Sequence, residues 1–317
     1  MRPDQVELDR LTAQHRFLPA TLEKVLRLGE LLVEFGRHPL LREVLLLKGG
    51  TALNLGSEAP PRLSVDLDFN YVRAEGREPM LADRPEIESA ISRIVAAGSY
   101  QVQLSADEHA GRKMFLSYQN AAGVPDRIEV DVNYMHRVTL ATPIEALIWQ
   151  PGDYPRPRVR QVGVDELAAG KLCALLDRAA PRDLFDAARL PGFVGPGWGL
   201  TPFRSVFIAL AGMLPHPVYS YGFDRLERAT DAAIREQLHP MLARRDDPPA
   251  GSWLRAQAWQ AVAPLLLLSD AEREFTDRLQ RGELRPELLF ADEPDLAARV
   301  ARHPVLLWKA QNAAKRR

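Results

Sequence analysis

The chain has 317 residues, of which 46% are hydrophobic and 26% charged, and its formal net charge at pH 7 is −1. It is therefore a globular protein with enough apolar residues for one large core or two smaller ones, and its overall charge does not attract nucleic acid. The single cysteine, Cys173, excludes an internal disulfide, and the lack of a signal core or bilayer-length apolar run favours a cytoplasmic protein without membrane contact.

The N-terminal part predicts a helix, then a strand and a glycine turn. Apolar residues recur at helical spacing over 19–36, and the short apolar run at 44–48 is typical of a buried strand. The sequence K-G-G-T ends this strand and leads into a helical pattern in the 50s. Glycines at a strand-to-helix turn allow backbone N–H groups to face a phosphate. The nucleotide-binding residues expected here are Lys48, Gly49, Gly50 and Thr51.

Polar and apolar residues alternate over 64–70, S-V-D-L-D-F-N, which predicts a half-buried strand. Asp66 and Asp68 then share one face, with Cα atoms roughly 6.6 Å apart, because a strand rises about 3.3 Å per residue. Their carboxylates would repel each other, and Mg²⁺ prefers one or two carboxylates together with substrate phosphates. We therefore expect Asp66 and Asp68 to hold Mg²⁺, or Mn²⁺ in its place, and Ser64 to contact the nucleotide. A D-x-D or a Gly-Gly alone recurs by chance, so the prediction depends on both together.

A helix at about 84–97 and strands at 100–104 and 112–119 are followed by a second alternating strand, 127–134. Glu129 and Asp131 lie on the polar face of that strand. If it pairs with the 64–70 strand, one of the two completes a cluster of three carboxylates, which suits two metal ions. The spacing does not say which one, and a solvated polar face on an edge strand is the alternative for both.

Residues 151–160, P-G-D-Y-P-R-P-R-V-R, predict a linker or an edge strand. We place a domain boundary here, with a catalytic domain at 1–162 and a helical domain at 163–317. In an extended segment Arg156, Arg158 and Arg160 would point the same way and could contact RNA phosphates. An ordinary solvated face is the favoured interpretation of these arginines.

A helical pattern begins at residue 164, and Lys171 lies within its apolar stripe between Leu167 and Leu175. Burying an ammonium group is costly unless it is paired. Lys171 must therefore extend to the edge of the helix or meet a fixed anion, for which a nucleotide triphosphate is the natural candidate.

The segment R-D-L-F-D at 182–186 opens a further helix after Pro181, and Asp183 would be favoured there by the helix dipole alone. The rest of the chain is mostly helical by pattern, without any constellation of catalytic residues. The helices expected there are 201–213, 223–243, 252–268, 270–281 and 293–311.

These motifs together resemble the polymerase-β-like nucleotidyltransferases, and among them the AbiEii/AbiGii toxins, a group similar to the MenT-type toxins of type IV toxin–antitoxin systems. The resemblance is carried by G-G-T, by the S-x-D-x-D strand, by D-V-N-Y and by the helical lysine followed by R-D-x-x-D. It implies an α+β fold, with a small mixed sheet flanked by helices and a mostly helical C-terminal domain. It also selects Asp131 over Glu129 as the third acid, and makes Lys171 a triphosphate contact and Asp183 a required acid.

The function implied by the resemblance is metal-dependent transfer of NMP from an NTP to RNA, most plausibly a tRNA 3′ end, by a toxin with a cognate antitoxin. Asp66, Asp68, Asp131, Lys171 and Asp183 would be its catalytic residues. Two alternatives stay open from the residues themselves. One is transfer to a protein or a small molecule, and the other is a nucleotide-binding module without catalysis.

Overall fold

The computed structural model of the chain describes residues 3–106, 110–244 and 248–315. They separate into two compact units, each with its own core. Unit 1 consists of the described residues within 1–137, 143–162 and 240–246, and unit 2 of those within 138–142, 163–239 and 247–317. The chain therefore passes between the two units several times.

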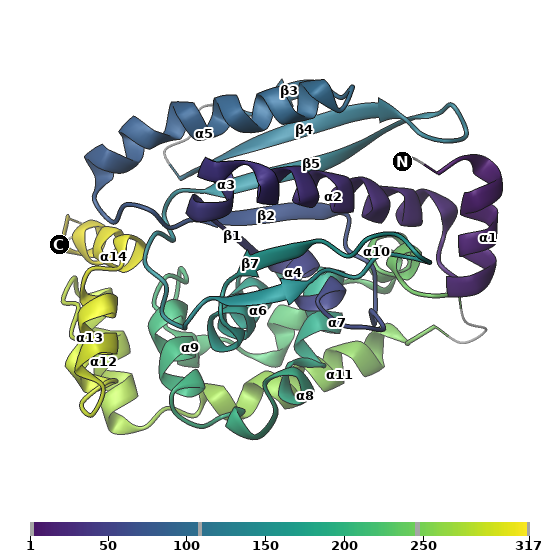
Figure 1. Ribbon diagram of the computed structural model, residues 1–317. Coiled ribbons are helices and arrows are strands. Elements are labelled where there is room, and N and C mark those ends of the chain that lie inside the picture. The colour runs from purple at the N-terminus through teal and green to yellow at the C-terminus, as the bar shows by residue number, and fades with distance from the viewer. Residues whose placement is uncertain (1–2, 107–109, 245–247, 316–317) are drawn as a thin grey trace. The chain divides into compact units, whose positions relative to one another are not determined.

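Unit 1 is built on one mixed sheet of seven strands. The strands are β1 (Leu45–Lys48), β2 (Asp66–Tyr71), β3 (Gln101–Leu104), β4 (Gly111–Gln119), β5 (Pro125–Asn133), β6 (Ile144–Leu147) and β7 (Arg158–Gln161). Their order across the sheet is β3-β4-β5-β2-β1-β7-β6. β5 is parallel to β2 and β7 is parallel to β1, whereas the other neighbours are antiparallel (Figure 1).

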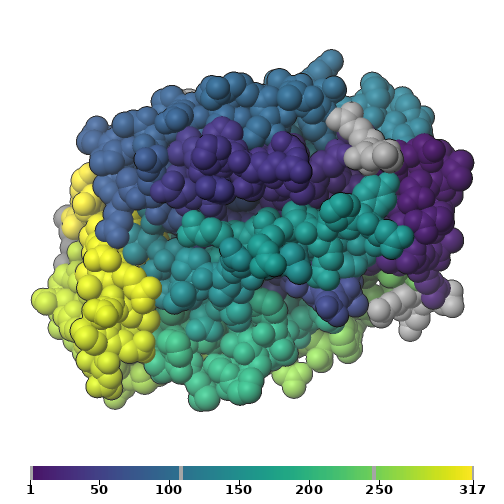
Figure 2. All heavy atoms as spheres, in the orientation of Figure 1, coloured from purple at the N-terminus to yellow at the C-terminus, as the bar shows by residue number. Residues whose placement is uncertain are grey.

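Helices cover the sheet of unit 1. They are α1 (Gln5–His15), α2 (Pro19–Arg37), α3 (Pro39–Val44), α4 (Gly49–Leu55) and α5 (Arg77–Ala97). α2 contacts α1, α3, α5 and β7, while α4 packs on β1 and β2. In the space-filling view, the side chains of α2 and α3 close over the middle of the sheet on the side that faces the viewer (Figure 2).

The apolar face of the central strands explains where α2 packs. Leu67 and Phe69 of β2 are buried, and the Phe69 ring lies 5.8 Å from the ring of Phe35 in α2. Because side chains alternate along a strand, Asp66 and Asp68 point to the opposite face. The acidic side chains are thus kept off the α2 core.

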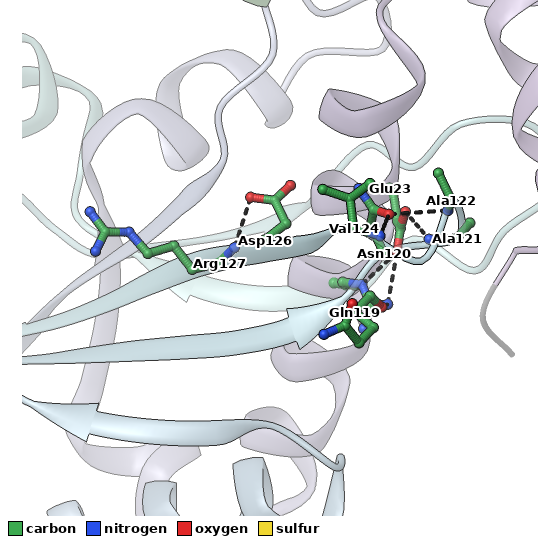
Figure 3. A network of polar contacts seen from close by, with 9 residues as sticks. Glu23, Gln119, Asn120, Ala121, Ala122, Val124, Asp126 and Arg127 are labelled. Carbon is green, nitrogen blue, oxygen red and sulfur yellow. Dashed lines mark hydrogen bonds and ion pairs between the residues drawn. The ribbon is translucent and has the colours of Figure 1, made fainter.

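The turn between β4 and β5 is held by side chains as well as by its backbone (Figure 3). Asn120 Oδ1 accepts hydrogen bonds from the N–H groups of Ala122 and Val124, at 3.1 and 2.9 Å. A carboxylate oxygen of Glu23, from α2, accepts the N–H of Ala121 at 2.9 Å. These bonds fix the hairpin, and with it the register in which β4 meets β5.

Unit 2 is helical in its described residues. Its α-helices are α6 (Val164–Arg178), α7 (Pro181–Ala187), α8 (Leu190–Val194), α9 (Phe203–Ala211), α10 (Asp231–Gln237), α11 (Gly251–Val262), α12 (Asp270–Gln280), α13 (Pro294–Ala301) and α14 (Pro304–Lys315). The main packing joins α6 to α9 and α7 to α11. Cys173 is buried in α6, as predicted.

Short 3-10 segments complete the element list. They are η1 (Gly195–Gly197), η2 (Val218–Ser220), η3 (Phe223–Arg228), η4 (His239–Met241), η5 (Ala263–Leu266) and η6 (Pro286–Leu288). Among the described residues, no helix is both long and apolar enough to cross a bilayer.

The structure confirms the predicted α+β class with a mixed sheet flanked by helices. Three predictions about elements were wrong. Residues 293–311 contain two helices, α13 and most of α14, because Pro304 cannot continue the first helix and begins the second. Residues 223–243 form η3, α10 and η4 instead of one helix, because Thr230 caps a new helix by accepting the N–H of Ala233 at 3.2 Å. The 151–160 segment leads into β7, which lies between β1 and β6 and is not an edge strand.

Candidate active site

One row of charged residues runs straight across four neighbouring strands of unit 1. Lys48 at the end of β1 is the register partner of Asp68 in β2, and Asp68 is the partner of Asp131 in β5. Asp131 is in turn opposite Lys113 in β4. Directly paired residues share a face of the sheet, so two carboxylates lie between two ammonium groups.

A second, shorter row lies one step along the strands. Asp66 of β2 pairs with Glu129 of β5, on the same face as Asp68 and Asp131. All four carboxylates are partly exposed. The ammonium of Lys113 makes a short hydrogen bond to Glu129 Oε1 and lies 3.6 Å from Asp131 Oδ2. The structure therefore brings both candidate third acids to the acidic face, with Asp131 beside Asp68 and Glu129 bound to a lysine.

Gly49 brings the strand-to-helix turn against the acidic row. Its φ angle is +75°, in the left-handed region that favours glycine. A Cβ atom added at Gly49 would overlap the carboxylate of Asp68. Glycine is required here both for the backbone conformation and for the close approach of the turn to Asp68.

The neighbouring polar residues of the turn are buried and hold the backbone in place. The Thr51 hydroxyl donates to the carbonyl oxygen of Asp66 at 2.6 Å, which ties α4 to the start of β2. A Cβ atom added at Gly50 would lie 2.7 Å from Ser64 Oγ and 3.1 Å from the Arg62 guanidinium. Arg62 and Ser64 are both buried, and Arg62 donates to the carbonyl of Leu63 at 2.9 Å. In this structure the Thr51 hydroxyl thus holds the turn, and the buried Ser64 hydroxyl lies close to Gly50.

Burial raises the pKa of the Asp131 carboxyl above its ordinary value. The charges of Lys48 and Lys113 oppose that rise, whereas the neighbouring carboxylates of Asp68 and Glu129 add to it. Burial by itself would lower the pKa of the Lys113 ammonium, but its hydrogen bond to Glu129 and the adjacent carboxylates raise it overall. The pKa values of Asp131 and Lys113 therefore depend on the neighbouring charges in the row.

A divalent metal fits the donors of this face. Carboxylate oxygens are the hard ligands that Mg²⁺ and Mn²⁺ prefer, and Mg²⁺ usually takes one or two carboxylates and completes its shell with phosphates and water. Asp68 and Asp131 lie side by side and Asp66 is two residues away on the same strand. Within the described ranges, no group of three or more Asp, Glu, His or Cys side chains is already arranged as a metal cage. The face therefore offers two adjacent carboxylates and a third nearby.

The two candidate residues of unit 2 are held in separate ion pairs. Lys171 of α6 is buried, and its ammonium lies 2.8 Å from Asp186 Oδ2 of α7. Asp183, also buried, accepts two hydrogen bonds from the Arg178 guanidinium, at 2.8 and 3.0 Å, and one from the Ala180 N–H at 3.2 Å. The anion that faces Lys171 in this structure is thus a carboxylate of the R-D-L-F-D segment.

A scan against protein families matches residues 30–196 to the family described as nucleotidyl transferase AbiEii toxin, type IV toxin–antitoxin system. The match spans more than half of the chain, and the resemblance seen in the motifs is confirmed. The chain belongs to the AbiEii family. It is accordingly a nucleotidyltransferase and a toxin of a type IV toxin–antitoxin system, which makes an NTP its substrate and implies an antitoxin partner.

A solved structure shares this fold. The MenT4 nucleotidyltransferase toxin of Mycobacterium tuberculosis H37Rv matches with a TM-score of 0.60 at 15% identity, over 93% of this chain and 98% of that one. An antigenic nucleotidyltransferase-like protein from Paracoccidioides brasiliensis covers 67% of this chain and 97% of its own, at 13% identity and a TM-score of 0.35. No curated protein matches the chain at a significant level.

Sequence reasoning missed three residues that shape the sites of this AbiEii chain. Lys113 lies on a strand that was predicted only from its apolar residues. Its partner on the neighbouring strand cannot be identified until the register of the two strands is known. Arg62 sits two residues before Ser64 and gives no periodic signal. Asp186 is three residues after Asp183, so the two acids lie on the same face of a helix. This spacing indicates that both acids face the same neighbouring helix.

The three arginines of the 156–160 segment have partners within unit 1. Arg158 donates to Glu145 at 3.2 Å, and Arg160 donates to the carbonyl of Glu43 at 2.8 Å. Arg156 lies 3.4 Å from the carbonyl of Leu147. The three side chains are exposed and have hydrogen-bond partners in their own unit.

Proposed function

We propose that this AbiEii nucleotidyltransferase transfers NMP from an NTP to the 3′ end of tRNA, in a reaction that depends on Mg²⁺ or Mn²⁺. The observation that supports the metal is the pairing of Asp68 with Asp131 beside the Gly49 turn. Asp66 would be the third carboxylate. A tRNA acceptor would place the reaction in the cytoplasm, as the sequence predicts.

Each part of the acidic face has a task in this reaction. Asp66, Asp68 and Asp131 would hold the metal, which when bound supplies charge compensation at the α-phosphate and activation of the acceptor hydroxyl. The acceptor oxygen then bonds to the α-phosphorus while the bond to the leaving pyrophosphate breaks. Lys48, Gly49, Gly50 and Ser64 would position the triphosphate, and Thr51 would also keep the turn in shape.

Lys171 and Asp183 of unit 2 stay predictions from the family motifs. Their ion pairs with Asp186 and Arg178 give each a fixed orientation. A fixed ammonium is what a triphosphate contact needs, since no conformational freedom is lost on binding.

The decisive experiment incubates the purified chain with total tRNA and each of the four NTPs, labelled at the α-phosphate, with Mg²⁺, Mn²⁺ or EDTA. Label in the tRNA band, lengthened by mass spectrometry and absent with EDTA, supports the proposal. The matched control is Asp68→Asn, which keeps the side-chain shape and removes the charge. Label in a protein band or a small-molecule product would move the acceptor to the alternative class. Transfer that persists in EDTA would rule out the metal.

A further inference from the structure

Lys113 is the one member of the charged row that no motif of the sequence includes. It lies on β4 opposite Asp131, and β4 is held to β5 along its full length. The hairpin bonds at Asn120 fix this pairing at one end of the strands (Figure 3). The position of Lys113 beside the acidic face is therefore a consequence of the fold and not of a flexible loop.

The Lys113 ammonium serves two carboxylates. It hydrogen-bonds Glu129 and lies 3.6 Å from Asp131, while Asp131 is itself beside Asp68. Without a positive charge at this place, three neighbouring carboxylates would repel one another across β2 and β5. The Lys113 ammonium thus compensates the negative charge of the carboxylates that a bound metal ion would otherwise neutralise.

The contacts of Lys113 with Glu129 and Asp131 are weak enough to break at little cost. The Lys113 side chain is 49% exposed, and ion pairs at such sites are typically worth less than about 1 kcal/mol because water screens them. Its four-carbon stem lets the ammonium swing into solvent without any movement of the strand. A divalent ion has twice the charge and binds carboxylate oxygens directly, so these carboxylates attract it more strongly than they attract an ammonium.

We propose that Lys113 is a positioning residue of the metal site: its ammonium is the internal counter-ion of Asp131 and Glu129, and the incoming divalent metal displaces it. This inference rests on the proposed function, because it requires that the acidic face binds metal. It assigns Glu129 a role distinct from that of Asp131, since Glu129 keeps the lysine near the face when the metal site is empty.

The test is the affinity of the full chain for Mn²⁺ alone, measured by electron paramagnetic resonance titration without nucleotide. Lys113→Met keeps the apolar stem and removes the charge, and we expect it to bind Mn²⁺ about three- to fivefold more tightly than the unchanged chain. Lys24→Met is the matched control. It removes a lysine that pairs with Asp126 at 2.8 Å in the same unit, and should leave the affinity within about twofold.

A second measurement separates this role from a structural one. In metal-free buffer Lys113→Met should melt at a lower temperature than the unchanged chain, and saturating Mn²⁺ should remove the difference. Unchanged or weaker Mn²⁺ binding in Lys113→Met would overturn the inference, since a merely structural lysine cannot hold back a metal.

Asp68→Asn distinguishes failure of the inference from failure of the metal assignment. If Asp68→Asn weakens Mn²⁺ binding while Lys113→Met changes nothing, only the role of Lys113 is wrong. If Asp68→Asn binds Mn²⁺ as well as the unchanged chain, the metal site itself is wrong and the inference falls with it.

Discussion

The ammonium of Lys171 and the carboxylate of Asp186 form a buried ion pair of 2.8 Å between α6 and α7. Lys171 stands in an apolar stripe and therefore needs a fixed anion, and the structure supplies one within the same unit. The pair orients the ammonium before any substrate arrives. It also means that the charge of Lys171 matters for folding as well as for any contact with a nucleotide.

Replacing Lys171 with methionine should lower the free energy of unfolding by about 3–5 kcal/mol, because it removes the buried ammonium that lies 2.8 Å from the Asp186 carboxylate. The double variant Lys171→Met/Asp186→Asn should recover part of that loss. Urea unfolding measures both. Arg278→Met is the control, since it breaks exposed pairs with Glu274 and Glu283 in the same unit and should have little effect on stability.

The double variant also separates folding from catalysis. If Lys171 contacts the triphosphate, Lys171→Met/Asp186→Asn stays inactive in the tRNA assay even where its stability is restored. Near-normal transfer by that variant would make the pair purely structural.

Gly49→Ala should abolish most transfer, because the new methyl group overlaps the Asp68 carboxylate and moves it from the acidic row. A displacement of about 1 Å at a reacting group can cost on the order of 100-fold in rate. Gly123→Ala is a close control, since its φ of +73° imposes similar backbone strain but its Cβ would meet no atom within 4 Å. Both variants should lose stability, by about 1 kcal/mol or more, but only Gly49→Ala should lose activity in the tRNA assay.

The acidic strand could be predicted from the sequence because its signal is local. Alternation places Asp66 and Asp68 on one face whatever their neighbours are. The third acid could not be settled in the same way, since Glu129 and Asp131 are two residues apart and share a face too. Only the register of β2 against β5, a contact between distant segments, places Asp131 beside Asp68.

The elements that were missed lacked a local signal or had a conflicting one. β6 (Ile144–Leu147) is short and mostly exposed, so its residues show no alternation to recognise. The break at Thr230 could have been recognised, because Thr-Asp is a favoured way to begin a helix. The partner of Lys171 required the packing of α7 on α6, which no periodicity within one helix contains.

The prediction that separates the two acids of β5 compares Asp131→Asn with Glu129→Gln. Asp131→Asn should reduce transfer by about 100- to 1000-fold if it holds metal at the reacting phosphate, since a single group that stabilises transition-state charge has effects of about that size. Glu129→Gln should be much milder, because its carboxylate is bound to Lys113. Rates with saturating NTP and tRNA decide the order, and the reverse order would make Glu129 the third ligand.

Arg27 of α2 holds the β4–β5 hairpin at the end of β4, next to the turn. The guanidinium bonds Glu23 at 2.7 Å, donates to the Gln119 carbonyl at 3.2 Å and lies 3.7 Å from the ring centre of Tyr118. Arg27→Met should destabilise the chain by about 3–5 kcal/mol, because the Glu23 carboxylate stays buried without its partner. Arg37→Met, which breaks an exposed pair with Glu34 on the same helix, should have little effect on urea unfolding. If both variants lose a similar, small amount of stability, the buried Arg27–Glu23 pair stabilises the chain no more than an exposed pair does.

Glu166 lies in the first turn of α6 and is buried in unit 2. Its Oε2 accepts the N–H groups of Leu140 and Ala141 at 2.8 and 3.1 Å, while Oε1 has no hydrogen-bond partner among the described residues. Burial raises the pKa of this carboxyl to about 7, against the two N–H bonds and the positive charge of Arg299, which lower it. The folded chain therefore holds this proton more tightly than the unfolded chain does.

A raised carboxyl pKa makes stability fall as pH rises. The contribution of Glu166 is fully present below its ordinary pKa of 4.5 and is lost as the pH passes through about 7, a total of about 3 kcal/mol. Glu166→Gln cannot ionise, so its melting temperature relative to the unchanged chain should rise between pH 5 and pH 8, by an amount that depends only on this titration. Glu236→Gln, at an exposed position on α10, should run parallel to the unchanged chain over the same range. Melting curves at four or five pH values test this, and a constant difference between Glu166→Gln and the unchanged chain would mean that Glu166 stays ionised in the folded protein.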